Sequence, residues 1–265
     1  MNRVASDLTE YRNAGMQVAK SILQSHMKNV YLSLSPSSNA NQIKTTLRLL
    51  TSMVTLGHLT AREVISTFDF SHACVTYILQ RRSLTDLPDV RSTYLIFITS
   101  FIIEEDSMVL RILGENRDIL QPIFNGLIYD SIGTLQLFLP TLRDKLVMSS
   151  LLSKTLKIRI FNEYTCQQLA QLFFWQGPHK APKKNLKEDK DGKKAPIVDE
   201  DIEEDQNAVA ETVTSLMMAL CTSHKFGLAF ADYSIGLSGK NKNIAVYRLI
   251  MVSATIIVYF QNKIN

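Results

Sequence analysis

Cysteine, proline and glycine are sparse in this chain of 265 residues, which contains three, seven and ten of them. Cys74, Cys166 and Cys221 are far apart and form no CxxC pair or cluster with histidine. We therefore expect no disulfide framework and no zinc site, and we interpret the cysteines as buried small hydrophobes in a reducing compartment. Hydrophobic residues make up 46% of the chain, which is enough to bury a continuous core.

The sequence also lacks the common motifs of catalysis. It contains no HExxH, no Gly-x-Ser-x-Gly and no GxGxxG, and its five histidines are scattered. The segment 236–241 resembles a phosphate-binding loop, but Ser234 replaces its first glycine and Asn241 replaces the magnesium-binding Ser or Thr. We expect neither an enzyme nor a site for a cofactor or metal.

No secretory signal is expected, because the first ten residues carry charges and no apolar stretch. Residues 244–260 are mostly apolar but barely long enough to span a bilayer, and Arg248 would be costly within it. We interpret this stretch as buried or as seeking a protein partner, and we expect no membrane contact.

Helical periodicity dominates the rest of the sequence. Ile43, Leu47, Leu50 and Val54 recur at three- and four-residue steps, which indicates one apolar helix face. Helices are predicted over 6–30, 42–56, 60–67, 71–81, 88–105, 107–113, 130–147, 154–175 and 211–226.

Several boundaries have a local reason. Ser6 or Asp7 is expected to cap the first helix, and the acidic residues 104–106 are expected to cap the helix that begins at Ser107. The serine-rich stretch 33–39 contains a proline and predicts a loop. Pro140 predicts a kink or a split in the helix over 130–147.

Helices of this length without alternating strands predict an all-α fold. The pattern shows no fixed-period repeat, but helix pairs spaced about forty residues apart are typical of HEAT and armadillo proteins. We expect a HEAT/armadillo-like helical repeat, an α-solenoid, with a globular helical bundle as the alternative.

Residues 177–206 differ in composition. They hold seven lysines followed mainly by nine acidic residues, and they contain no aromatic residue. Such a segment cannot bury enough apolar area to offset its ordering entropy, so we expect a disordered charged loop. The predicted organisation is a helical repeat over 1–176, the loop over 177–206, the continued repeat over 207–251, and an atypical apolar tail over 252–265.

Basic residues are the candidates for contact with nucleic acid. Outside the predicted loop the chain carries 22 basic and 16 acidic residues. Lys154, Lys157 and Arg159 fall within two helical turns and could contact phosphate, although a solvated helix face is the alternative. Within the loop, the lysines are candidates for a nuclear-import signal: Lys183, Lys184, Lys193 and Lys194.

An ordered set of segments carries a resemblance to a known family. These are 49–55 (LLTSMVT), 68–70 (FDF), 89–91 (DVR), Tyr94, Ser100, Phe101, 154–162 (KTLKIRIFN), Leu172, Trp175, 221–227 (CTSHKFG) and 232–236 (DYSIG). Together they resemble the N-terminal region of the nucleolar pre-ribosomal-associated protein family.

The resemblance implies a very large helical-repeat scaffold that acts early in assembly of the large (pre-60S) ribosomal subunit and in pre-rRNA processing. It implies a location in the nucleus and nucleolus. The implied partners are other ribosome-assembly factors, including a DEAD-box RNA helicase, with pre-rRNA and small nucleolar RNA as possible ligands. It carries no catalytic residue. The alternative is a generic HEAT/armadillo module that binds proteins without RNA contact.

The end of the chain departs from the family. Members of the family continue for many hundreds of residues, and 252–265 do not resemble their continuation. We therefore expect a truncated array, whose last repeat exposes an apolar face that the next repeat would cover.

Overall fold

The computed structural model describes residues 2–35, 37–68, 87–172, 175 and 200–222, and this part of the chain is all-α, as expected, with no strand. The helices are α1 Asn2–Ser25, α2 Met27–Leu32, α3 Ala40–Val54, α4 His58–Thr67, α6 Leu87–Ile103, α7 Ser107–Glu115, α8 Arg117–Phe124, α9 Ile132–Thr141, α10 Lys154–Ile160, α11 Glu163–Gln171 and α12 Glu200–Thr222. A 3₁₀ turn, η1, covers Leu127–Tyr129, and a π-helix, η2, covers Leu142–Val147.

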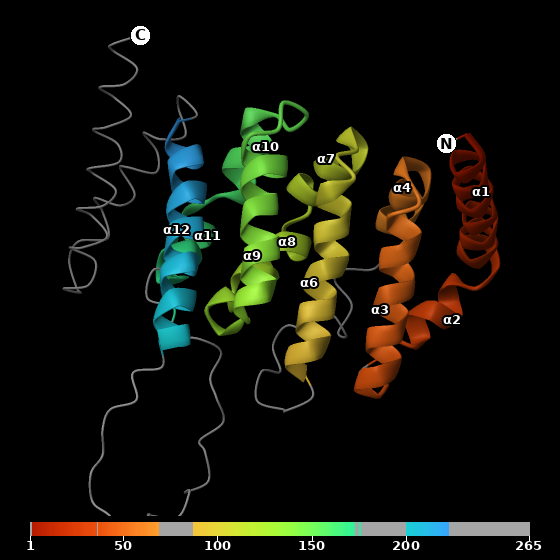
Figure 1. The fold of residues 1–265 in the computed structure, drawn as a ribbon, viewed down its shortest axis with the longest axis horizontal. Helices are drawn as coiled ribbons and strands as arrows, with labels where there is room; N and C mark the ends of the chain where they lie inside the picture. Colours follow the sequence, from red (N-terminus) through yellow and green to blue (C-terminus); the bar gives the residue numbers. More distant parts are fainter. Residues whose placement is uncertain (1, 36, 69–86, 173–174, 176–199, 223–265) are drawn as a thin grey trace, which may run out of the picture.

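The long helices stand side by side in a row that runs from α1 at one end, through α3, α6 and α9, to α12 (Figure 1). In this row α3 packs on α6, α6 packs on α9, and α9 packs on α12. The other helices contact one another in the same order: α4 packs on α7, α7 packs on α10, and α8 packs on α11. Each helix therefore packs on its counterpart one step along the row.

The apolar face predicted between residues 42 and 56 is confirmed. Ile43, Leu47, Leu50 and Val54 are all buried on α3. Asn39 begins this helix with a capping box, because its side chain accepts a hydrogen bond from the Gln42 amide and the Gln42 side chain accepts one from the Asn39 amide. The predicted loop over 33–39 is confirmed in the residues described.

The prediction of one helix over 6–30 is wrong. α1 begins at Asn2, so Ser6 and Asp7 lie within it rather than at its N-terminus, and the helix is interrupted at His26 before α2. Leu8, placed on the predicted apolar face, is 65% exposed. The three- and four-residue spacing continues through the break, so it could not reveal the change of direction there.

The single helix predicted over 154–175 is also wrong. It divides into α10 and α11, because Asn162 starts a new helix by accepting a hydrogen bond on its side chain from the Thr165 amide. Ile158, assigned to the apolar face, is half exposed. Helix α8 was not predicted. At Pro140 the expected interruption takes the form of a change from α to π winding at Leu142.

The predicted charged loop is too long at its C-terminal end. Helix α12 begins at Glu200, so 200–206 are helical rather than disordered. The acidic residues of this stretch lie in the first turns of α12, where negative charge complements the helix dipole. The rest of the predicted loop and the predicted helix over 71–81 lie outside the described residues.

The buried apolar side chains form one continuous cluster that extends from Ala19 in α1 to Leu220 in α12. Aromatic rings pack together within it: the ring centroid of Phe97 on α6 lies 5.2 Å from that of Phe68, which follows α4, and 4.9 Å from that of Phe101 on the same helix. Farther along, the ring of Phe124 contacts those of Phe138 and Phe161. Cys166 is buried in this core, as expected, and its thiol donates to the Phe161 carbonyl.

A buried ion pair crosses this core. Arg91 of α6 donates to both carboxylate oxygens of Asp130, at 2.6 and 2.8 Å, and also to the Ile123 carbonyl at 3.0 Å. Both side chains are almost fully buried, and the Trp175 indole N–H donates to the Asp130 backbone carbonyl. The pair therefore connects α6 to the loop before α9 and to the residues after α11.

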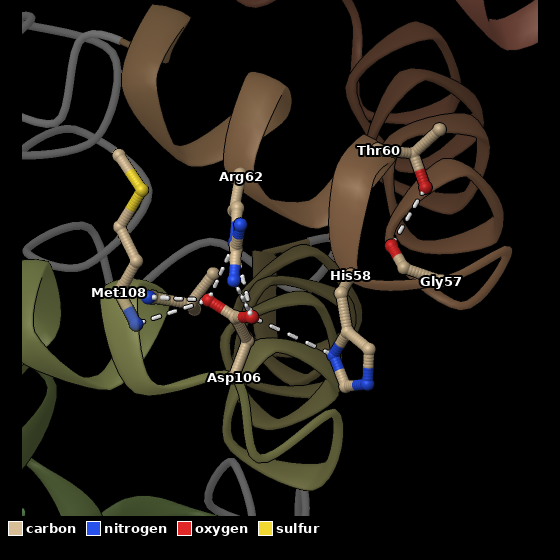
Figure 2. Close-up of polar contacts among 7 residues, drawn as sticks. Gly57, His58, Thr60, Arg62, Asp106 and Met108 are labelled. Carbon is tan, nitrogen blue, oxygen red and sulfur yellow. Dashed lines mark hydrogen bonds and ion pairs between the residues drawn. The ribbon is translucent and has the colours of Figure 1, made fainter.

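A second polar joint connects α4 to α7 (Figure 2). Arg62 donates through two nitrogens to Asp106, whose carboxylate also accepts hydrogen bonds from the amides of Met108 and Val109 at the start of α7. His58 lies 3.8 Å from the same carboxylate. The expected capping at residues 104–106 is thus confirmed for Asp106. Its carboxylate also forms an ion pair with Arg62 of α4.

Replacing Arg91 tests the buried pair. We expect R91M to lower the free energy of unfolding by about 3–5 kcal/mol, because Asp130 would remain buried without its cation. R111M is the matched control: Arg111 pairs with Glu115 at 3.8 Å on an exposed surface, so its loss should cost less than about 1 kcal/mol. Urea unfolding followed by circular dichroism measures both, and equal values would contradict the buried-pair interpretation.

The Asp106 joint predicts a dependence of stability on acid. The hydrogen bond from Arg62 lowers the pKa of Asp106 below its ordinary value, against the opposing effect of burial. The ionised carboxylate therefore stabilises the fold above the ordinary aspartate pKa of about 3.9, and this contribution is lost as the pH falls through the lowered pKa.

We accordingly expect D106N to cost about 1–3 kcal/mol at pH 6 and progressively less toward pH 3. Urea unfolding of both proteins at pH 6, 4 and 3 gives this difference directly. A cost that stays constant across this range would show that the carboxylate charge contributes nothing.

Candidate functional site

Helix α10 carries the three basic residues that the sequence nominates. It begins at Ser153, whose hydroxyl accepts a hydrogen bond from the Leu156 amide. Its apolar side packs on α7 at Gly114, where an added Cβ would lie 3.2 Å from the Cβ of Leu156. This close approach, which glycine allows, fixes which face of α10 remains at the surface.

Two of the three basic side chains lie at that surface. Lys154 and Arg159 are exposed, and no hydrogen bond or ion pair within the described part of the chain engages either side chain. Arg159 lies in the last turn of α10, where the helix dipole favours a cation. Both residues are therefore placed where a phosphate group could reach them.

Lys157 has a different environment. Its ammonium group donates to the backbone carbonyls of Val147, at 2.8 Å, and Ser149, at 2.6 Å. Burial lowers its pKa below the ordinary lysine value, and the nearby charge of Lys154 lowers it further. Lys157 thus joins α10 to the end of the π-helix η2, and it has less freedom than its neighbours to contact a ligand.

A depression of about 360 Å³, lined by polar and amphipathic residues, lies close to α10, between α8 and α11. Arg117 and Gln121 line it from successive turns of α8, and Tyr164 and Gln167 line it from successive turns of α11, with Asn162 at the start of that helix. The sequence pattern did not predict that these residues come together. Asn162 belongs to a segment of the family resemblance, but no motif connects it to α8.

Most of the polar side chains in the depression make no hydrogen bond to another residue that the structure describes. Asn162 donates to the Arg159 carbonyl and accepts from the Thr165 amide. Within the described part of the chain, no hydrogen bond or ion pair engages the side chains of Arg117, Gln121, Tyr164 or Gln167. Among the described residues that line the depression, none is acidic.

Other sequence predictions concern residues that lie elsewhere. Lys183, Lys184, Lys193 and Lys194, the loop at 236–241 and the apolar stretch 244–260 lie outside the described residues. Where the structure describes the chain, no group of His, Cys, Asp and Glu could hold a metal ion. No described helix combines the length and apolar character needed to cross a bilayer.

Comparison with known proteins identifies the family of this chain. The family model described as "Ribosome 60S biogenesis N-terminal" matches residues 1–256. The chain belongs to this family. The resemblance inferred from the ordered segments is thereby confirmed, and the helical row, the basic helix α10 and the depression all lie within the matched region.

Two relatives support the assignment. Nucleolar pre-ribosomal-associated protein 1 of Homo sapiens and that of Mus musculus are each 31% identical to this chain over 251 residues. The match covers 94% of this chain but only 10% of each relative. No solved structure matches the chain.

The two lysines of α10 provide a test of their different roles. We expect K157M to lower the free energy of unfolding by about 1–3 kcal/mol, because two backbone carbonyls lose their donor. K154M, on the same helix, should change it by less than about 0.5 kcal/mol, since that side chain is exposed and unbonded. Parallel urea titrations distinguish the two, and equal stability of the variants would refute the structural role of Lys157.

Proposed function

We propose that this chain is a non-catalytic scaffold in assembly of the large ribosomal subunit and in pre-rRNA processing, acting in the nucleus and nucleolus. The observation that carries the proposal is the family match over residues 1–256. The names of the two relatives, which describe nucleolar association with pre-ribosomes, agree with it.

The architecture we propose is a HEAT/armadillo-like α-solenoid. Helices α3, α6 and α9, the last of which η2 continues, begin at residues 40, 87 and 132, and the helices that follow them, α4, α7 and α10, begin at 58, 107 and 154. Helices α8 and α11 begin at 117 and 163. These intervals are close to the ~40–47 residues of HEAT and armadillo repeats, and counterpart helices pack on one another as stacked repeats do.

Contact with RNA is part of the proposal. Lys154 and Arg159 present two exposed cations on one short helix. Phosphate binding is mostly electrostatic, and the excess of basic residues outside 177–206 favours it. We retain Lys157 as a candidate contact in the second rank, because its ammonium is already bonded to two carbonyls.

The partners in this proposal are other ribosome-assembly factors, including a DEAD-box RNA helicase, together with pre-rRNA and small nucleolar RNA. They follow from the family resemblance. Lys183, Lys184, Lys193 and Lys194 remain candidates for nuclear import. A helical-repeat module that binds proteins without RNA is the second candidate, and the exposed apolar residues Met148, Leu151 and Ile158 near α10 favour it.

A salt titration tests the RNA contact. We expect the full chain to bind a fluorescent single-stranded RNA of mixed sequence, with the logarithm of the association constant falling linearly with the logarithm of salt concentration. The double variant K154Q/R159Q should reduce this slope by about 1.4, which corresponds to two lost phosphate contacts on a single strand. Fluorescence anisotropy at several salt concentrations measures it.

The matched control is K20Q/R48Q, which removes two exposed basic residues from α1 and α3. This variant should retain the slope of the unmodified chain. The protein-binding alternative predicts no measurable RNA binding. Equal slopes in all three proteins would remove α10 from the proposed RNA surface.

A further inference from the structure

The depression between α8 and α11 has a defined place in the helical row. Helix α8 begins at Arg117 and follows α7, and helix α11 begins at Glu163 and follows α10. The two helices pack on one another. The depression therefore lies between equivalent elements of two successive helix groups. Surfaces built from successive repeats are where solenoid proteins bind extended ligands.

The lining combines groups that recognise an unpaired base. The amides of Gln121, Asn162 and Gln167 can each donate and accept, as the edge of a nucleobase requires. Tyr164 supplies an aromatic ring on which a base can stack. The volume of about 360 Å³ lies at the lower end of the ~300–1,000 Å³ typical of small-ligand pockets.

One cation lines the depression together with these amides. Arg117 lines the depression from α8, and its guanidinium can pair with a phosphate through two hydrogen bonds. The Asn162 side chain donates to the backbone carbonyl of Arg159, at 3.1 Å, so the depression adjoins the end of α10. A nucleotide in the depression would have Arg117 near a flanking phosphate.

We propose that this depression binds one unstacked nucleotide of a single-stranded RNA, with the base against Tyr164 and the amides and a flanking phosphate at Arg117. The inference rests on the proposed RNA contact and assigns it a site. The lining suits a nucleotide, because three amides, one aromatic ring and one guanidinium can together contact the edge of a base, its face and its phosphate. Duplex RNA is excluded, since its bases are already stacked and paired.

The test compares variants of Tyr164 in the full chain. We expect Y164L to weaken binding of a 12-nucleotide single-stranded RNA by about 5- to 150-fold, the range for loss of one stacked base. Y164F keeps the ring and should bind within about twofold of the unmodified chain. Y11L is the matched control, because Tyr11 is 78% exposed on α1 at the far end of the row.

A second variant does not depend on the ring. Q167E preserves the size of a half-buried side chain but places a carboxylate in the lining of the depression. Because this negative charge repels the RNA phosphates, Q167E should weaken RNA binding at low salt. The same RNA annealed to its complement should bind Y164L and the unmodified chain equally. Thermal unfolding followed by circular dichroism establishes that each variant is folded.

The outcomes distinguish RNA binding by the chain from binding of a nucleotide in the depression. If the unmodified chain binds no RNA in anisotropy at low salt, the RNA contact fails and this site fails with it. If it binds RNA but folded Y164L and Q167E bind as tightly, the RNA contact stands and the site is overturned, which leaves a protein side chain as the occupant of the depression. Loss of duplex binding in Y164L to the same degree would also overturn the assignment of an unstacked base.

Discussion

The long helices of this chain bury apolar side chains against both neighbours in the row, and this shared burial positions everything else. Helix α6 shows it most clearly, because it packs on α3 along one side and on α9 along the other. Tyr94, Phe97, Ile98 and Phe101 are fully buried on it. Burial of each such side chain contributes on the order of 1.5–3 kcal/mol, so the row is stabilised by contacts between neighbours rather than by any single helix.

Polar joints set the spacing between these helices at the turns. Arg12 of α1 donates to the Leu56 carbonyl in the turn between α3 and α4. Arg62 bonds to Asp106 at the next such turn, and Lys145 of η2 bonds to Glu105 beside it, at 2.6 Å. Each joint uses a basic side chain to engage a turn of an adjacent group of helices. Apolar packing alone is non-directional, so these bonds supply the geometric definition that it lacks.

The sequence predicts the helices best where one face alone is buried. In α3 the spacing of Ile43 and Leu47 is regular because the opposite face is exposed. Breaks within an apolar pattern were missed at His26 and Asn162, since the period continues across each of them. The acidic start of α12 was interpreted as disorder because its composition resembles a solvated loop.

The buried ion pair and the depression are each formed by residues that are distant in sequence. Hydrophobic periodicity cannot predict which distant residues come together. Arg91 and Asp130 are 39 residues apart and become a pair only when α6 packs beside the loop before α9. The depression likewise requires α8, which was not predicted, and the start of α11, which was placed inside a longer helix. Lys154 and Arg159 were identified because they are neighbours in sequence. Their availability, and the engagement of Lys157, follow from packing that brings the end of η2 to α10.

The arrangement divides structural and binding roles between helices for a physical reason. Helix α6 packs between two neighbours and has little polar surface left, as the burial of Val90, Leu95 and Ile102 illustrates. A short helix such as α10 buries one side, at Leu156 and Ile160, and leaves the other side to solvent. Charged and amide side chains can therefore accumulate on α8, α10 and α11 without cost to the core. A ligand can therefore bind to these exposed sides without disturbing the apolar packing between the long helices.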